Sequence, residues 1–229
     1  VVTFCPLCHT ALVFERTVDA TTHDFGTTGN LRYSDLVMYD RQTESWWQQA
    51  TGEAIMGSLT GAKLRFLPAQ IVSLADFATA YPDADVLSRD TGVSRDYGRN
   101  PYPGYDRADE RPFLFDGVID GRLAPKERVV TLDRDGRSIA IPYSTLETSG
   151  VVLVKELTPP VVVFWSPGTA SALDDPLIGQ SRDVGATGVF VPAAGGRSLI
   201  VSRDFDRDGR TKDAETGPTR PGTGSDAAG

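Results

Sequence analysis

The two cysteines, separated by only two residues, are the side chains of this sequence best suited to chemistry. They are Cys5 and Cys8, in the run CPLCH that ends at His9. Two thiolates at this spacing can bind one soft or borderline metal ion, because the turn between them aims both sulfurs at one point. A complete site needs one or two more ligands. The candidates that the sequence offers are His9, His23, Met38 and Met56.

The ion that such a site would hold depends on these additional ligands. The sequence contains no second CxxC motif, so a zinc site built from four cysteines is excluded within this chain. With imidazole and thioether ligands, ligand softness favours copper, and zinc is the other candidate.

Three other interpretations of the CPLCH run stay open. A dithiol–disulfide couple is one, although a thioredoxin-like couple needs a helix after the motif and TALVFERTV predicts a strand. Covalent haem is another, because the run fits C-x-x-C-H with His9 as axial ligand. The flanking strands are an unusual setting for that chemistry, and we do not expect haem. The third is structural, with Cys5 and Cys8 as small buried hydrophobes or a local disulfide.

A second motif lies near the end of the sequence. The run DFDRDGRTKDAE matches the calcium-loop pattern D-x-D-x-D-G-x5-E. The oxygen ligands would come from Asp204, Asp206, Asp208, Arg210 and Glu215. An EF-hand is excluded, because RSLIVSR before the loop is strand-like and TGPTRPG after it does not form a helix. A calcium loop outside an EF-hand and an acidic β-turn remain as the alternatives.

Composition excludes several classes of function. The formal net charge of -8 and the pI of about 4.8 disfavour nucleic acid as a partner. No run of about 18 apolar residues is present, so we expect no transmembrane segment. We find no supported Ser-His-Asp or Cys-His pair and no phosphate-binding glycine loop. The sequence therefore identifies neither a reaction nor a small-molecule or protein partner.

Short apolar segments alternating with turns predict a mainly β fold (α+β) of antiparallel sheets. VVTF predicts a buried strand leading into Cys5, and residues 24–30 contain enough turn formers to predict a turn. One helix is predicted over residues 68–81, where apolar residues recur at helical spacing. Residues 90–111 predict a long loop, and residues 133–136 a hairpin turn.

Internal similarity predicts that the antiparallel β-rich unit is duplicated. VVTFCPLCHTALVFE resembles VVVFWSPGTASALDD, and YDRQTES resembles KDAETGP in the same order. We therefore expect a first unit over residues 1–117, a cysteine-free copy over 118–217, and a disordered tail over 218–229. We also expect both ends of the duplicated unit to be truncated. Chance similarity between short β segments is the alternative.

The segments VTFCPLCHTALVFERTVD, FGTTGNLRYSDLVMYDRQTESWWQQATGEAIMGSLTGAKLRFLP and YGRNPYPGY resemble domain-of-unknown-function family 3179. The resemblance extends from residue 1 to about residue 217. It implies an uncharacterised prokaryotic protein located outside the cytoplasm, because members commonly carry an export signal or a lipid anchor. Members usually have Asn or Gly where this chain has His9, which argues further against haem.

We therefore expect an exported protein with a metal-binding or redox site at the CxxC motif. The alternative is a non-catalytic binding or scaffold module in which Cys5 and Cys8 are structural.

Overall fold

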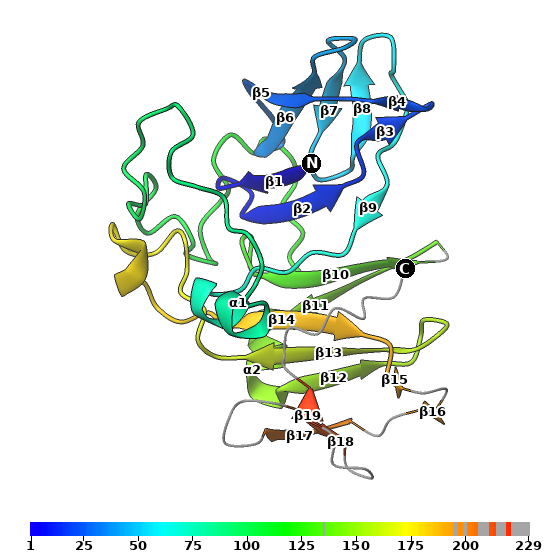
Figure 1. The fold of residues 1–229 in the computed structure, drawn as a ribbon, viewed down its shortest axis with the longest axis vertical. Coiled ribbons are helices and arrows are strands. Elements are labelled where there is room, and N and C mark those ends of the chain that lie inside the picture. The colour runs from blue at the N-terminus through cyan, green and yellow to red at the C-terminus, as the bar shows by residue number, and fades with distance from the viewer. Residues whose placement is uncertain (135, 195–196, 199–200, 206–210, 214–218, 221–229) are drawn as a thin grey trace. The chain divides into compact units, whose positions relative to one another are not determined.

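The chain forms a mainly β structure with short helices (Figure 1). The computed structural model describes residues 1–134, 136–194, 197–198, 201–205, 211–213 and 219–220. Its antiparallel sheets and its helices confirm the predicted fold class. The chain divides into two compact units, one built from Val1–Ala69 and Gly104–Lys126, the other from Gln70–Pro103 and the described residues after Lys126. The sequence repeat and its boundaries stay predictions.

The first unit contains a three-stranded sheet, a four-stranded sheet and a short hairpin, all antiparallel (Figure 1). The three-stranded sheet has the order β1-β2-β9, the four-stranded sheet the order β5-β6-β7-β8, and β3 pairs with β4. The bounds are β1 Val2–Cys5, β2 Thr10–Phe14, β3 Thr17–Val18, β4 Thr21–Thr22, β5 Phe25–Arg32, β6 Asp35–Asp40, β7 Trp46–Gln48, β8 Glu53–Met56 and β9 Phe66–Leu67.

Strand β1 is buried on one face only, which corrects the prediction of a buried strand. Val2 and Phe4 are exposed, whereas Thr3 and Cys5 point inward. This alternation follows from the two-residue period of side chains along a strand. Because Cys5 pairs with Thr10 in the β1–β2 hairpin, the turn between these strands carries the second cysteine.

The turn predicted over residues 24–30 is wrong, because this segment forms part of strand β5. Gly29 takes a left-handed φ of 78° at a register shift between β5 and β6, so the glycine serves a bulge. The chain reverses instead at Tyr33 and Ser34, which both have positive φ, 53° and 69°. This two-residue turn places Asp35 at the first position of β6.

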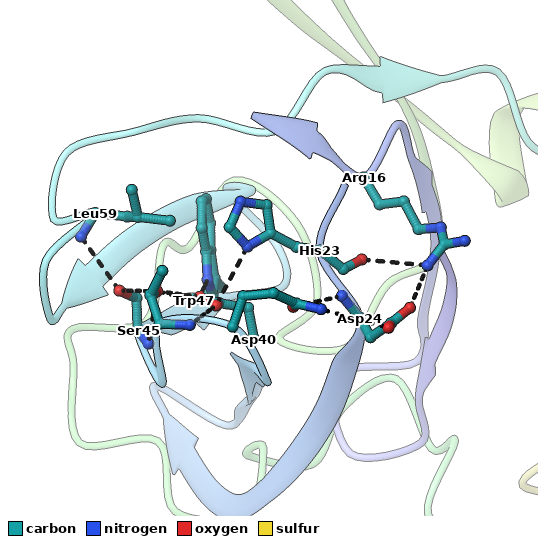
Figure 2. Close-up of polar contacts among 9 residues, drawn as sticks. Arg16, His23, Asp24, Asp40, Ser45, Trp47 and Leu59 are labelled. Carbon is teal, nitrogen blue, oxygen red and sulfur yellow. Dashed lines mark hydrogen bonds and ion pairs between the residues drawn. The ribbon is translucent and has the colours of Figure 1, made fainter. Parts of the chain in front are cut away.

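A buried carboxylate fixes the turn between β6 and β7 (Figure 2). Asp40 accepts hydrogen bonds from the indole Nε1 of Trp47 at 2.9 Å and from the backbone N–H of Thr43 at 2.6 Å. The Thr43 hydroxyl lies 2.9 Å from the same carboxylate, and His23 Nδ1 lies 3.3 Å from it. The network borders an apolar cluster of Phe14, Met38, Trp47, Ala54 and Leu64.

The second unit carries the predicted helix, as α1 Leu74–Ala80 (Figure 1). The helix begins later than predicted, because the Ser73 side chain caps it by accepting the backbone N–H of Asp76 at 3.1 Å. The remaining elements are β10 Val129–Arg134, β11 Arg137–Pro142, α2 Tyr143–Ser149, β12 Val151–Val154, β13 Val161–Ser166, η1 Ile178–Gln180, β14 Ala186–Phe190, β15 Ala193–Ala194, β16 Arg197–Ser198, β17 Val201–Phe205, β18 Thr211–Asp213 and β19 Thr219–Arg220.

Two local predictions in this part of the chain are confirmed. Strands β10 and β11 form the hairpin predicted around residues 133–136, and residues 90–111 form a loop without helix or strand. Helix α2 was not predicted; its Leu146 is fully buried in a core with Ile141 and Val163. Except for Thr219–Arg220, the predicted disordered tail lies outside the described residues.

Candidate functional site

Two thiols and one carboxylate converge in the first unit. The sulfurs of Cys5 and Cys8 and a carboxylate oxygen of Asp35 all lie within 4.8 Å of one another. Cys5 and Asp35 are only 2% and 3% exposed, and Cys8 is half-buried. Both cysteines are free thiols. The cluster therefore joins residues that are about thirty positions apart in the sequence, and sequence analysis had found only its two sulfurs.

Hydrogen bonds hold the turn from Cys5 to Thr10 in a conformation in which the two sulfurs lie close together. The backbone N–H of Cys8 donates to Cys5 Sγ at 3.5 Å, and the Thr10 hydroxyl donates to the carbonyl of Cys8 at 2.9 Å. His9, between them, has a left-handed φ of 48°. The Tyr105 hydroxyl donates to the carbonyl of Leu7 at 2.9 Å and so fixes the outer side of the turn.

The carboxylate of Asp35 is oriented by the segment that follows strand β7. The backbone N–H of Ala50 donates to Asp35 Oδ2 at 2.9 Å, and Oδ1 lies 3.2 Å from Cys8 Sγ. None of the ion pairs among the described residues includes Asp35. A buried carboxylate without a basic partner is costly unless a cation compensates its charge. The arrangement therefore suits a bound cation.

A buried amide completes the surroundings of Cys8. Gln49 is 0% exposed and follows the last residue of β7. Its Nε2 donates to the Thr3 hydroxyl at 2.8 Å and to the carbonyl of Thr10 at 3.0 Å. Its Oε1 lies 3.7 Å from Cys8 Sγ. The donor side of this amide therefore faces the β1–β2 hairpin, and its oxygen faces the sulfurs.

The comparison with protein families assigns the chain to one family. The model of the family described as "Protein of unknown function (DUF3179)" matches residues 1–225. The chain belongs to the DUF3179 family. No match was found among curated proteins or among solved structures. In the described part of this DUF3179 protein, no helix has the length and apolarity needed to cross a membrane.

The two thiols of this DUF3179 protein have opposite acidities. The hydrogen bond from the Cys8 thiol lowers the pKa of Cys5 to about 6 despite its burial, and the backbone N–H groups of Cys8, Leu36 and Leu7 act in the same direction. The same hydrogen bond to Cys5, together with burial and the nearby charge of Asp35, raises the pKa of Cys8 above its usual range. The pair therefore holds one thiolate and one thiol at neutral pH.

This acidity difference predicts a two-step titration of the metal-free DUF3179 protein. The ultraviolet absorbance of thiolate should show one equivalent forming at about pH 6, with the second forming only in strong alkali. The urea-unfolded chain is the control, because both of its thiols should titrate together at about pH 8.5. A folded protein whose two thiols titrate together like those of the unfolded chain would contradict the assignment.

The structure does not bring the other sequence candidates to the two sulfurs. The ring nitrogen Nδ1 of His23 faces Asp40, and Met38 is buried in the apolar cluster. The His9 ring packs edge-on against Phe4 at 5.9 Å, and Met56 is exposed. The calcium-loop prediction falls outside the described residues, apart from the backbone of Asp204 and Phe205 in β17 and of Thr211–Asp213 in β18.

Among the described residues, the His23–Asp40 pair of this DUF3179 protein does not form part of a nucleophilic triad (Figure 2). Such a triad needs a hydroxyl or thiol hydrogen-bonded to the imidazole, with the carboxylate on its other nitrogen. Here the Thr43 hydroxyl contacts Asp40, and the Ser45 hydroxyl contacts Thr43 at 2.7 Å. The Thr43 hydroxyl thus binds the carboxylate and the Ser45 hydroxyl binds Thr43, which indicates a structural network.

Proposed function

We propose that the chain binds one zinc ion through Cys5, Cys8 and Asp35. The observation that carries the proposal is the convergence of two free thiols on a buried carboxylate that has no basic partner among the described residues. A divalent cation would compensate the charges that the thiolates and the carboxylate bring into the interior.

The separations between donor atoms support a four-coordinate ion. With Zn–S bonds of about 2.3 Å and Zn–O bonds of about 2.0–2.2 Å, a tetrahedral ion requires sulfur and oxygen donors about 3.5 Å apart and two sulfurs about 3.8 Å apart. Cys8 Sγ and Asp35 Oδ1 are 3.2 Å apart. All three donors lie within 4.8 Å of one another. These separations are therefore compatible with three donors that share one ion.

The donor set supports zinc rather than copper. The sequence-based preference for copper depended on imidazole and thioether ligands, and His23 and Met38 make other contacts. Two thiolates with a carboxylate form a borderline set, which suits zinc. Zinc binding needs both thiols deprotonated. The lowered pKa of Cys5 favours binding at neutral pH, whereas the raised pKa of Cys8 opposes it, so the ion must displace the proton of Cys8 when it binds.

Elemental analysis after reconstitution with zinc and removal of excess metal tests the proposal. We expect one zinc ion per chain, and Asp35→Asn should weaken binding by about tenfold or more, because a neutral amide is the poorer ligand. The matched control is Asp24→Asn, which removes an exposed carboxylate from the same unit and should leave binding unchanged. A wild-type chain that retains no zinc, or an Asp35→Asn variant that binds like the control, would refute the site.

A dithiol–disulfide couple is the second candidate. It is supported by two free thiols in one turn, of which Cys5 has the lowered pKa and Cys8 is half-exposed. Oxidised glutathione would accept the two electrons, leaving a Cys5–Cys8 disulfide and two reduced glutathione molecules. Mass spectrometry of the metal-free protein should then show the loss of two hydrogen atoms. Zinc-loaded protein should resist the same treatment, because both states need the same sulfurs.

A further inference from the structure

The side chain of Gln49, the residue after β7, lies beside the cysteine pair. It is 0% exposed, and its Oε1 lies 3.7 Å from Cys8 Sγ. We propose that Gln49 Oε1 is the fourth ligand of the ion, an inference that rests on the zinc site proposed above. The ion would then be held by Cys5, Cys8, Asp35 and Gln49, with no position left for a substrate.

The orientation of the amide is fixed by its hydrogen bonds. Nε2 donates to the carbonyl oxygen of Thr10 at 3.0 Å, and a carbonyl oxygen can only accept. The second hydrogen of Nε2 is directed to the Thr3 hydroxyl at 2.8 Å, which in turn donates to the carbonyl of Leu12 at 2.8 Å. A flipped amide would set two carbonyl oxygens against each other at Thr10. Gln49 therefore presents its oxygen, and not its nitrogen, to the site.

The oxygen of Gln49 has an incomplete set of partners. Its hydrogen bond among the described residues is with the thiol of Cys8, at the long distance of 3.7 Å. That sulfur donates also toward Asp35 Oδ1 at 3.2 Å, and one thiol has only one hydrogen to share. A fully buried amide oxygen ordinarily has a stronger partner. A cation among these donors would provide that partner.

The distance agrees with shared coordination. Two donors of a tetrahedral zinc ion, one sulfur and one oxygen, lie about 3.5 Å apart. The separations of Cys8 Sγ from Asp35 Oδ1 and from Gln49 Oε1, 3.2 and 3.7 Å, lie on either side of this value. Three protein ligands with an open position are typical of catalytic zinc, whereas four protein ligands are typical of structural zinc.

A closed site would connect three segments of the first unit. The ligands come from the turn between β1 and β2, from the first residue of β6, and from the residue after β7. Their contacts already place these segments together, and the ion would join them through four bonds. The consequence is a stabilising centre without Lewis-acid chemistry on an exogenous molecule.

Cobalt substitution tests whether the site is closed. We load the metal-free chain with Co²⁺, record its visible and charge-transfer absorption bands, and add excess azide as a probe of an open position. The wild-type spectrum should be that of four-coordinate cobalt with sulfur ligands and should not change with azide. In Gln49→Leu, which keeps the side-chain volume but lacks the oxygen, cobalt should bind about tenfold or more weakly. Its spectrum should shift when azide enters the vacated position.

The matched control is Gln48→Leu at the neighbouring position. Gln48 is also buried, but its oxygen accepts a hydrogen bond from Arg32. The Gln48→Leu variant should bind cobalt as tightly as the wild type, and its spectrum should not change with azide.

A wild-type cobalt spectrum that shifts with azide would overturn the fourth-ligand assignment and leave the three-ligand site standing. A wild-type chain that binds no cobalt or zinc would refute the zinc proposal itself. The wild-type azide experiment decides the assignment even when Gln49→Leu fails to fold.

Discussion

Replacing Cys8 with serine is expected to weaken zinc binding by at least about two orders of magnitude. Structural zinc sites release about 10–16 kcal/mol on binding, so each of four ligands contributes roughly 3 kcal/mol, and every 1.4 kcal/mol corresponds to about a factor of ten. A serine hydroxyl at neutral pH is a far weaker zinc ligand than a thiolate. The measurement is competition for zinc against a chromophoric chelator, at one pH and one ionic strength.

His9→Ala is the matched control for Cys8→Ser. His9 directly follows Cys8 and belonged to the ligand set predicted from the sequence, but it is not in the cluster that the sulfurs form with Asp35. We expect its zinc affinity to remain close to that of the wild type. Equal losses in the two variants would mean that the imidazole is a ligand, and unchanged affinity in Cys8→Ser would exclude the site.

Asp40→Asn is expected to lower the free energy of unfolding by about 3 kcal/mol. The substitution removes a buried charged acceptor, so the groups that donate to it lose their hydrogen-bond partner. Asp40 is 0% exposed and accepts from the side chain of Trp47 and from Thr43. Asp24→Asn is again the control, since Asp24 is exposed and pairs with Arg16, and it should cost less than about 1 kcal/mol. Urea unfolding followed by tryptophan fluorescence, with zinc held constant, measures both.

The cost of Asp40→Asn should also depend on pH. Burial opposes ionisation of Asp40, but the hydrogen bonds from Trp47, Thr43 and His23 outweigh it and lower the pKa of this carboxyl. The folded-state pKa of Asp40 lies below the unfolded value of about 3.9. The stabilisation by ionised Asp40 is therefore complete above about pH 3.9 and is lost as the pH falls through the folded-state pKa. The difference between wild type and Asp40→Asn should therefore shrink below about pH 4. A constant difference down to pH 2 would contradict this assignment of charge.

Patterns that depend on near neighbours in the chain were readable from the sequence. The alternation of short apolar segments with turns predicted the antiparallel sheets, and the helical spacing of apolar residues predicted α1. The CxxC spacing likewise identified Cys5 and Cys8, because two residues and one turn suffice to bring both sulfurs together. In each case the determining interactions lie within a few residues.

The other half of the site depends on pairing between strands. Asp35 is placed by a turn at Tyr33 and Ser34, two residues that rarely adopt positive φ, so the sequence directed the turn to FGTTGN instead. Gln49 is placed by the register of β6 with β7, and its neighbours Thr3 and Thr10 lie on another sheet. A single sequence carries no local signal for these contacts. The same reason explains why His23 and Met38 were chosen as ligands by residue type alone.

X-ray absorption at the zinc edge of the zinc-loaded wild-type chain tests the central claim most directly. We expect the zinc ion to be surrounded by two sulfurs at about 2.3 Å and two oxygens at about 2.0–2.2 Å. A first shell without sulfur, or one with a single sulfur and several imidazole nitrogens, would contradict it.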